Sequence, residues 1–306
     1  MPQLSQRARI VRDIVARFNI ETDYPEITMK TADVSELEGF SYPPFFESDI
    51  IELPNCKMER LARTKDICKK NENIILHIHG GGYVTKFKRN YHRVAGYYSE
   101  VSRGMDVYSL DYRVAPENPY PAALNDAEDA LKWLEKNVTT ADHIILGGDS
   151  AGAGLAIALT MKCRDMGVKL PKEIIAMSPW GDLAAEGKSY EENKEIDPVF
   201  GGMRSDLIYK NPYFGKENPR NPYISPCYGD FTDFPPMLIQ SGTDEMLLSD
   251  SETIAQKMRD AGGRIRFTKY EGMFHVFQMA GKMMDESARA WAEVGKFIDT
   301  IEGLDE

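Results

Sequence analysis

The stretch "IILGGDSAGAGLAIALTMKC", residues 144–163, begins as an apolar strand and continues as a helix rich in small residues. At the junction, residues 148–152 read Gly-Asp-Ser-Ala-Gly and match the pattern G-x-S-x-G. A sharp strand-to-helix turn favours glycine on both sides of the serine, because side chains there would clash. The stretch therefore predicts a nucleophile elbow that presents Ser150, although a serine at this place can also be a helix N-cap.

The alternation of apolar strand and amphipathic helix extends outward from this turn. Helical patterns cover residues 122–137 and 251–263, and such alternation implies parallel β-α-β units. Continuous apolar runs indicate a sheet that is covered on both faces by helices. The predicted fold class is therefore α/β with a mostly parallel central sheet. Its expected strands are residues 73–79, 106–113, 143–150, 173–179, 235–242 and 264–272.

Two segments interrupt this alternation. Residues 1–45 begin with an amphipathic helix, and residues 183–224 are rich in Pro, Gly, Asn and aromatic residues. The second segment is too long for a plain loop between two strands. We expect both segments to form a helical lid over the ends of the sheet, and residues 46–182 and 225–306 to form the two parts of the core.

Composition limits the classes of partner. The chain of 306 residues has a formal net charge of -11, which argues against nucleic acid or an anionic membrane as a partner. Neither a signal-type N-terminus nor a long apolar span is found, so we expect a soluble, cytoplasmic protein. The oligomeric state is left open, and a homo-oligomer is possible.

The cysteines form no CxxC or CxxH pattern, so we expect no metal, no cofactor and no disulfide framework. These cysteines are Cys56, Cys68, Cys163 and Cys227.

A nucleophilic serine needs a base and an acid, and in a fold with such an elbow these follow it in the chain order Ser, Asp or Glu, His. His275 is the one histidine of the sequence that follows Ser150. Asp244 comes directly after the strand 235–242, and catalytic groups gather at the carboxyl ends of parallel strands. Asp244 is therefore the expected acid. The competitor Glu245 should point elsewhere as its direct neighbour, and Asp250 suits the first turn of the next helix.

The sequence His-Gly-Gly-Gly, residues 79–82, follows another strand. Attack on a carbonyl creates an oxyanion, which backbone N–H groups stabilise when no side chain stands in the way. The expected donors are Gly81, Gly82 and Ala151, the residue after the nucleophile. We expect His79 to brace the loop through hydrogen bonds. A flexible turn is the simpler alternative for these glycines.

Five segments together resemble one known family: "HGGGYV", "DYRVAPENPYPAALNDAEDALKWL", "GGDSAGAGLA", "SGTDEMLLSDS" and "YEGMFHVF". The family is the hormone-sensitive-lipase-like α/β-hydrolases, also called the bacterial family IV carboxylesterases. The resemblance runs from about residue 74 to the C-terminus. It implies the α/β-hydrolase fold, Ser150 as nucleophile, Asp244 as acid and His275 as base. It also implies that Asp111, Arg113 and Glu117 hold a loop near the site.

Some positions depart from the family's pattern. Ala153 replaces the last glycine of the usual GDSAGG, and Tyr83 stands where Trp or Phe is common. After Asp244 the chain reads Glu-Met-Leu-Leu-Ser-Asp, where many relatives have Pro-Leu-x-Asp. This departure weakens the assignment of the residues around the acid.

Lid aromatics are candidates for a substrate pocket, although they can equally serve to pack the lid. Tyr83, which follows the glycine loop, and Tyr209 and Phe214 of the lid are the expected substrate-binding residues. Tyr190, Phe200 and Tyr213 are further candidates.

The expected function is a serine carboxylesterase that hydrolyses short-chain, acetyl-like esters of small molecules through an acyl-enzyme. An acetyl-sugar deacetylase, an arylformamidase or another amidase with the same triad remains open. A prolyl-oligopeptidase-type peptidase would need a large extra domain, for which the chain has no room. A non-catalytic ligand receptor of the same fold typically lacks the histidine, so His275 argues against it.

Overall fold

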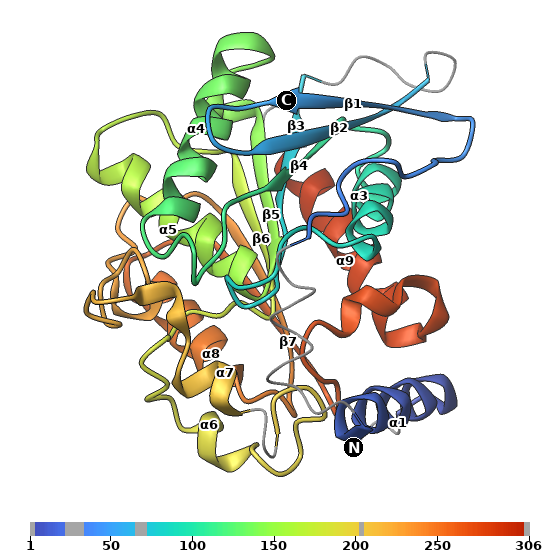
Figure 1. The fold of residues 1–306 in the computed structure, drawn as a ribbon, viewed down its shortest axis with the longest axis vertical. Helices are drawn as coiled ribbons and strands as arrows, with labels where there is room; N and C mark the ends of the chain where they lie inside the picture. Colours follow the sequence, from blue (N-terminus) through green and yellow to red (C-terminus); the bar gives the residue numbers. More distant parts are fainter. Residues whose placement is uncertain (1–3, 22–33, 65–71, 202–204, 303–306) are drawn as a thin grey trace.

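The computed structural model describes residues 4–21, 34–64, 72–201 and 205–302. Its centre is a sheet with the strand order β1-β2-β4-β3-β5-β6-β7-β8, in which β3 to β8 run parallel (Figure 1). The predicted α/β class and mostly parallel sheet are confirmed. The six parallel strands are β3 (Ile74–Ile78), β4 (Val107–Asp111), β5 (Ile144–Asp149), β6 (Glu173–Met177), β7 (Met237–Gly242) and β8 (Ile265–Tyr270).

Helices cover both faces of the sheet, as the apolar strands require. One face packs against α3 (Asn90–Val101) and α9 (Asp285–Glu302). The other packs against α4 (Ala122–Asn137), α5 (Ala151–Asp165) and α8 (Leu248–Asp260). In the described part of the chain, no helix is long and apolar enough to cross a bilayer. Short 3-10 helices lie at Ala141–His143, Pro212–Phe214, Pro226–Tyr228 and Phe277–Met283.

Two strands were not predicted from the sequence: β1 (Phe46–Glu52) and β2 (Lys57–Arg63). They form an antiparallel hairpin, which joins the parallel strands by the antiparallel pairing of β2 with β4. β1 is the edge strand, and most of its side chains are exposed. Charged residues therefore interrupt its apolar pattern, which hides the strand from a search for buried runs.

One end of the sheet carries α1 (Gln6–Glu21), α6 (Ser189–Glu192) and α7 (Ser205–Tyr209), as Figure 1 shows. These helices lie within the two segments expected to form a lid. Residues 36–42 instead pack against the main body: the N–H of Glu36 donates to the carbonyl of Phe87, and the hydroxyl of Tyr42 donates to Glu59. The exact division of the chain at residue 45 stays a prediction.

A partly buried ion pair fastens α4 to the segment that follows β4. The carboxylate of Asp126, which is fully buried, accepts hydrogen bonds from the guanidinium and the backbone N–H of Arg113. Asp111 accepts the N–H of Phe87 at 3.0 Å, whereas Glu117 is exposed. Arg113 and Asp111 therefore brace the loop between the sheet and the helices.

Replacing Asp126 with Ala should lower the free energy of unfolding by about 2–4 kcal/mol, because Arg113 would lose its charged partner and its N–H acceptor. Chemical denaturation measures the change. Lys282→Ala is the control, since the Lys282–Glu100 pair lies on the surface and should contribute less than about 0.5 kcal/mol. Equal effects of the two changes would contradict a bracing role for Asp126.

Candidate active site

The turn at Ser150 joins β5 to α5 in a strained conformation. Its φ of 53° and ψ of -124° are rare for a residue with a side chain. A Cβ added to Gly152 would lie 2.0 Å from the carbonyl oxygen of Ile78, so only glycine fits there. The side chain of Ser150 makes no capping hydrogen bond to α5. Its hydroxyl is therefore not used as an N-cap, and the predicted elbow is what the structure shows.

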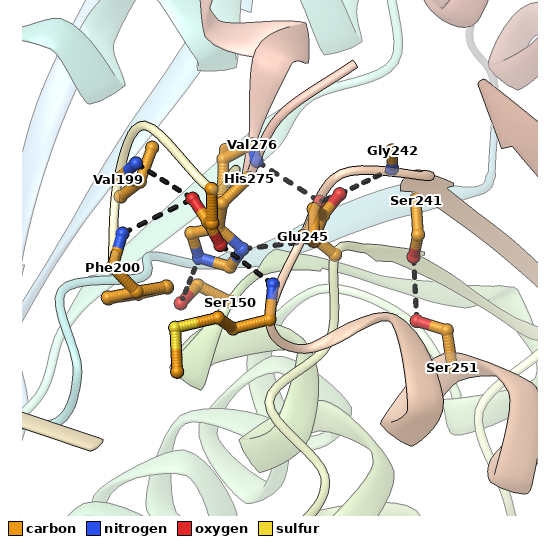
Figure 2. A network of polar contacts seen from close by, with 12 residues as sticks. Ser150, Val199, Phe200, Ser241, Gly242, Glu245, Ser251, His275 and Val276 are labelled. Carbon is orange, nitrogen blue, oxygen red and sulfur yellow. Dashed lines mark hydrogen bonds and ion pairs between the residues drawn. The ribbon is translucent and has the colours of Figure 1, made fainter. Parts of the chain in front are cut away.

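Three side chains form a hydrogen-bonded chain at this turn (Figure 2). His275 Nε2 lies 2.9 Å from Ser150 Oγ, and His275 Nδ1 lies 3.1 Å from Glu245 Oε2. A carboxylate accepts hydrogen bonds, so the Nδ1 proton is donated to Glu245 and Nε2 accepts from the serine hydroxyl. The sequence prediction that Ser150 and His275 meet is confirmed by this geometry.

The carboxylate of Glu245 is fully buried and held on both oxygens. Its Oε1 accepts hydrogen bonds from the hydroxyl of Ser178 and from the backbone N–H of Gly242. The same Ser178 hydroxyl accepts the N–H of Val276, the residue after the histidine. These contacts fix the position of the carboxylate relative to the imidazole.

The expectation that Asp244 contacts the histidine and that Glu245 points away is wrong. Asp244 Oδ2 instead lies 2.6 Å from Nη1 of Arg12 on α1, and its side chain is 22% exposed. Successive side chains of the turn after β7 point in different directions, and the longer one reaches the imidazole. The sequence carries one hint, the replacement of the family's usual proline by Glu245. The Arg12 partner lies 232 residues away, and no local pattern indicates it.

The other competitor, Asp250, lies away from the imidazole. Its buried carboxylate accepts the N–H groups of Gly181 and Asp182 and the hydroxyl of Tyr190. It therefore anchors the start of the lid to α8.

The glycine loop passes directly beside the serine, because a Cβ on Gly80 would lie 3.1 Å from the Cβ of Ser150. The carbonyl of Gly80 accepts a hydrogen bond from His79 Nδ1 at 2.6 Å, as expected for a bracing histidine. The carbonyl of Gly81 accepts the N–H groups of Val84 and Thr85. In a trans peptide the N–H points opposite the carbonyl, so the N–H groups of Gly81 and Gly82 face away from these contacts.

The N–H groups of Gly81 and Gly82 donate to no other group among the residues that the structure describes. The N–H of Gly80, by contrast, donates to Asp149 Oδ1 at 3.2 Å. Ala151 is the first residue of α5, where N–H groups have no partner within the helix. The N–H groups of the three predicted oxyanion-hole residues thus remain available, and their role stays a prediction.

Lid residues cover the serine, which is 4% exposed, and the histidine, which is 7% exposed. The ring of Phe200 lies 4.7 Å from the imidazole, and Leu207 reaches within 3.2 Å of the Cβ position of Gly82. Phe200 was a candidate from the sequence, whereas Leu207 was missed because an isolated leucine carries no signal.

The three expected substrate-binding residues make other contacts. Tyr83 is buried and stacks on Tyr213 at 3.8 Å, so it packs the lid onto the core. Tyr209 is 40% exposed, and its hydroxyl lies 3.3 Å from Glu191 on the surface. Phe214 is partly buried against the main core. The contacts of Tyr83 and Tyr209 therefore indicate that both residues help to pack the lid.

Comparison with known proteins agrees with the fold. Residues 75–279 match the family described as alpha/beta hydrolase fold. An acetyl-hydrolase of Streptomyces hygroscopicus is 33% identical over 83% of this chain and 83% of its own length. A solved hormone-sensitive lipase from a metagenome library is 30% identical, with a TM-score of 0.86 over 98% of this chain and 99% of its own.

A further solved structure is that of EstE5 soaked with p-nitrophenyl butyrate. It is 28% identical, with a TM-score of 0.84 over 97% of this chain and 99% of its own. The fold and the site together define an α/β-hydrolase. The chain belongs to the hormone-sensitive lipase family of these hydrolases, and it is an enzyme that acts on carboxylic esters.

Asp149, next to the serine, is a buried carboxyl group whose pKa is perturbed. Burial raises the pKa of Asp149 from 3.8 to about 7, although the hydrogen bond from Tyr91 and the charge of His275 act in the opposite direction. The native state therefore holds this proton at pH values where the unfolded chain has lost it. Stability from this group is present below about pH 4 and falls as the pH rises toward about 7.

Asp149→Asn should remove this loss of stability at rising pH, because an amide does not ionise and can still form hydrogen bonds with Gly80 and Tyr91. The unfolding free energy of the variant should rise relative to the wild type between about pH 4 and about pH 7. Denaturant titrations across this range measure the difference. The control is Asp233→Asn at an exposed position. A constant difference between variant and wild type would show that Asp149 does not titrate in this window.

Proposed function

We propose that the protein is a serine esterase that hydrolyses short-chain acyl esters of small molecules through an acyl-enzyme. The observation that carries the proposal is the Ser150–His275–Glu245 chain, which stands beside available N–H groups of the glycine loop. Neither a helix cap nor a packed core serine needs such an arrangement. A serine nucleophile, an imidazole base and an orienting acid do.

In this mechanism the hydroxyl of Ser150 attacks the ester carbonyl, and its proton passes to His275 Nε2. Glu245 keeps the proton on Nδ1 and stabilises the imidazolium that forms. The imidazolium then protonates the leaving alcohol. A water molecule gives its proton to the same nitrogen and attacks the acyl-enzyme, and the imidazolium then returns the proton to Ser150 Oγ as the acid leaves.

The tetrahedral intermediates carry a negative oxygen. The N–H groups of Gly81, Gly82 and Ala151 are its proposed donors, and each such donor contributes about 10²- to 10³-fold in rate in comparable enzymes. Because the loop is braced by His79 and Asp149, the donors keep their direction before the substrate arrives. Little reorganisation is then needed during the reaction.

Short acyl groups are favoured by the lid residues around the serine. Phe200 lies against the imidazole and Leu207 against Gly82, which restricts the space beside the nucleophile. The acetyl-hydrolase relative and the EstE5 structure soaked with p-nitrophenyl butyrate agree with small acyl groups. A panel of p-nitrophenyl esters from acetate to long chains, run beside acetylated sugars, tests the preference and separates an esterase from a sugar deacetylase.

Ser150→Ala should lower kcat on p-nitrophenyl acetate or butyrate by about 10⁴-fold or more, because the nucleophile is lost. The variant should also lose labelling by a fluorophosphonate probe, while circular dichroism shows the fold intact. Retained labelling or full turnover would rule out Ser150 as the nucleophile.

The pair Glu245→Gln and Asp244→Asn distinguishes the two acids. Glu245→Gln should lower kcat by about 10³- to 10⁴-fold, because the imidazole loses the acceptor that sets its tautomer. Asp244→Asn weakens the contact with Arg12 and should change kcat by less than about fivefold, as expected for a partly exposed ion pair. If Asp244→Asn is the more damaging change, the acid has been assigned to the wrong residue.

A further inference from the structure

Side chains of the lid bind the backbone of the turn that carries Glu245. The amide of Asn193 donates to the carbonyls of Thr243 and Glu245, at 3.0 and 2.7 Å. The hydroxyl of Ser189 donates to the carbonyl of Met246 at 2.6 Å. Strand β7 ends at Gly242, and the turn also makes two backbone hydrogen bonds, from the N–H of Thr243 to the carbonyl of Tyr270 at 3.0 Å and from the N–H of Asp244 to that of Met273 at 3.1 Å.

Asp197 makes the most central of these lid contacts. Its side chain is 4% exposed, and its Oδ2 accepts the N–H of Met246, the residue after the acid, at 2.7 Å. Its Oδ1 accepts the N–H groups of Val199 and Phe200, at 2.7 and 3.2 Å. One carboxylate thus ties the acid turn to the segment that places the Phe200 ring against the imidazole (Figure 2).

A second fastening lies on the other side of the same turn. Besides its contact with Asp244, Arg12 donates to the carbonyl of Ile196 at 2.7 Å and to that of Gly272 at 2.9 Å. Ile196 directly precedes Asp197, and Gly272 lies three residues before His275. The lid, the acid turn and the histidine loop therefore meet at one place and are linked by charged hydrogen bonds.

From these contacts we infer that Asp197 is a positioning residue: it holds Glu245 in reach of His275 and makes the lid part of the acid–base machinery. The inference rests on the proposed function, because it concerns the acid of the proposed triad. Asp197 makes no hydrogen bond to Ser150 or His275 among the described residues, so it acts through its neighbours. A lid with this role does more than cover the substrate.

The variant Asp197→Asn tests the inference sharply. An asparagine has one acceptor oxygen and one NH₂ group, whereas Asp197 accepts backbone N–H groups on both of its oxygens. In the variant, one of these N–H groups therefore faces the NH₂ group, which is itself a donor, and its hydrogen bond is lost. The expected result is a fall in kcat of about 10- to 100-fold with KM changed less than about threefold, because a small misplacement of the acid slows the chemical step. The control is Glu195→Gln, an exposed acid of the same segment, which should leave both constants unchanged.

A double-mutant cycle with Glu245→Ala decides whether Asp197 acts through the acid. In the Glu245→Ala background there is no acid left to position. Adding Asp197→Asn there should lower kcat by less than about a further threefold. An equal loss in both backgrounds, or a rise in KM at constant kcat, would overturn the inference while leaving the esterase intact. A wild-type protein that hydrolyses no ester in the panel would instead overturn the proposed function itself.

Asn193→Ala serves as the second variant if Asp197→Asn melts at a much lower temperature than the wild type. It removes the hydrogen bond to the Glu245 carbonyl from a partly exposed position. It should also lower kcat more than KM changes, and lose that effect in the Glu245→Ala background. An effect on kcat that persists there would overturn the inference.

Discussion

The strained turn at Ser150 constrains everything around it. Its positive φ is kept by the surrounding packing, in which α5 lies so close to β3 that a Cβ on Gly152 would collide with the carbonyl of Ile78. The N–H of Ser150 donates to the carbonyl of Met177 at the end of β6, which adds a link to the neighbouring strand. The serine hydroxyl is thereby placed at the end of the sheet, where loops from other strands can reach it.

Two of those loops approach the serine in different ways. The glycine loop brings backbone groups, and each of its carbonyls is bound so that the N–H groups of Gly81 and Gly82 stay available. The histidine loop brings a side chain, whose ring Glu245 orients from the opposite side. The buried Asp149 links the first loop to the elbow through Gly80. The buried polar groups of these loops are therefore hydrogen-bonded, while the N–H groups of Gly81 and Gly82 stay available.

The acid turn differs from both loops because the lid supplies much of its support. Asn193 and Asp197 bind the backbone around Glu245, and Arg12 of α1 binds Asp244 beside it. The lid segments that cover the serine thus also help to position Glu245. Changes in the lid, where related esterases are expected to differ most, would then affect rate as well as selectivity.

The sequence by itself determined β3 to β8, the elbow at Ser150, the glycine loop and the approach of His275. Each of these depends on a pattern within a few residues, such as an apolar run or glycines around a serine. Only the tertiary structure decided that Glu245 rather than Asp244 faces the imidazole, since adjacent acids differ in direction and the partner Arg12 lies far away in the chain. It also decided the β1–β2 hairpin and the roles of Tyr83, Phe200 and Leu207. Exposed edge strands and lid side chains take their places from contacts with distant residues, and such contacts leave no local pattern.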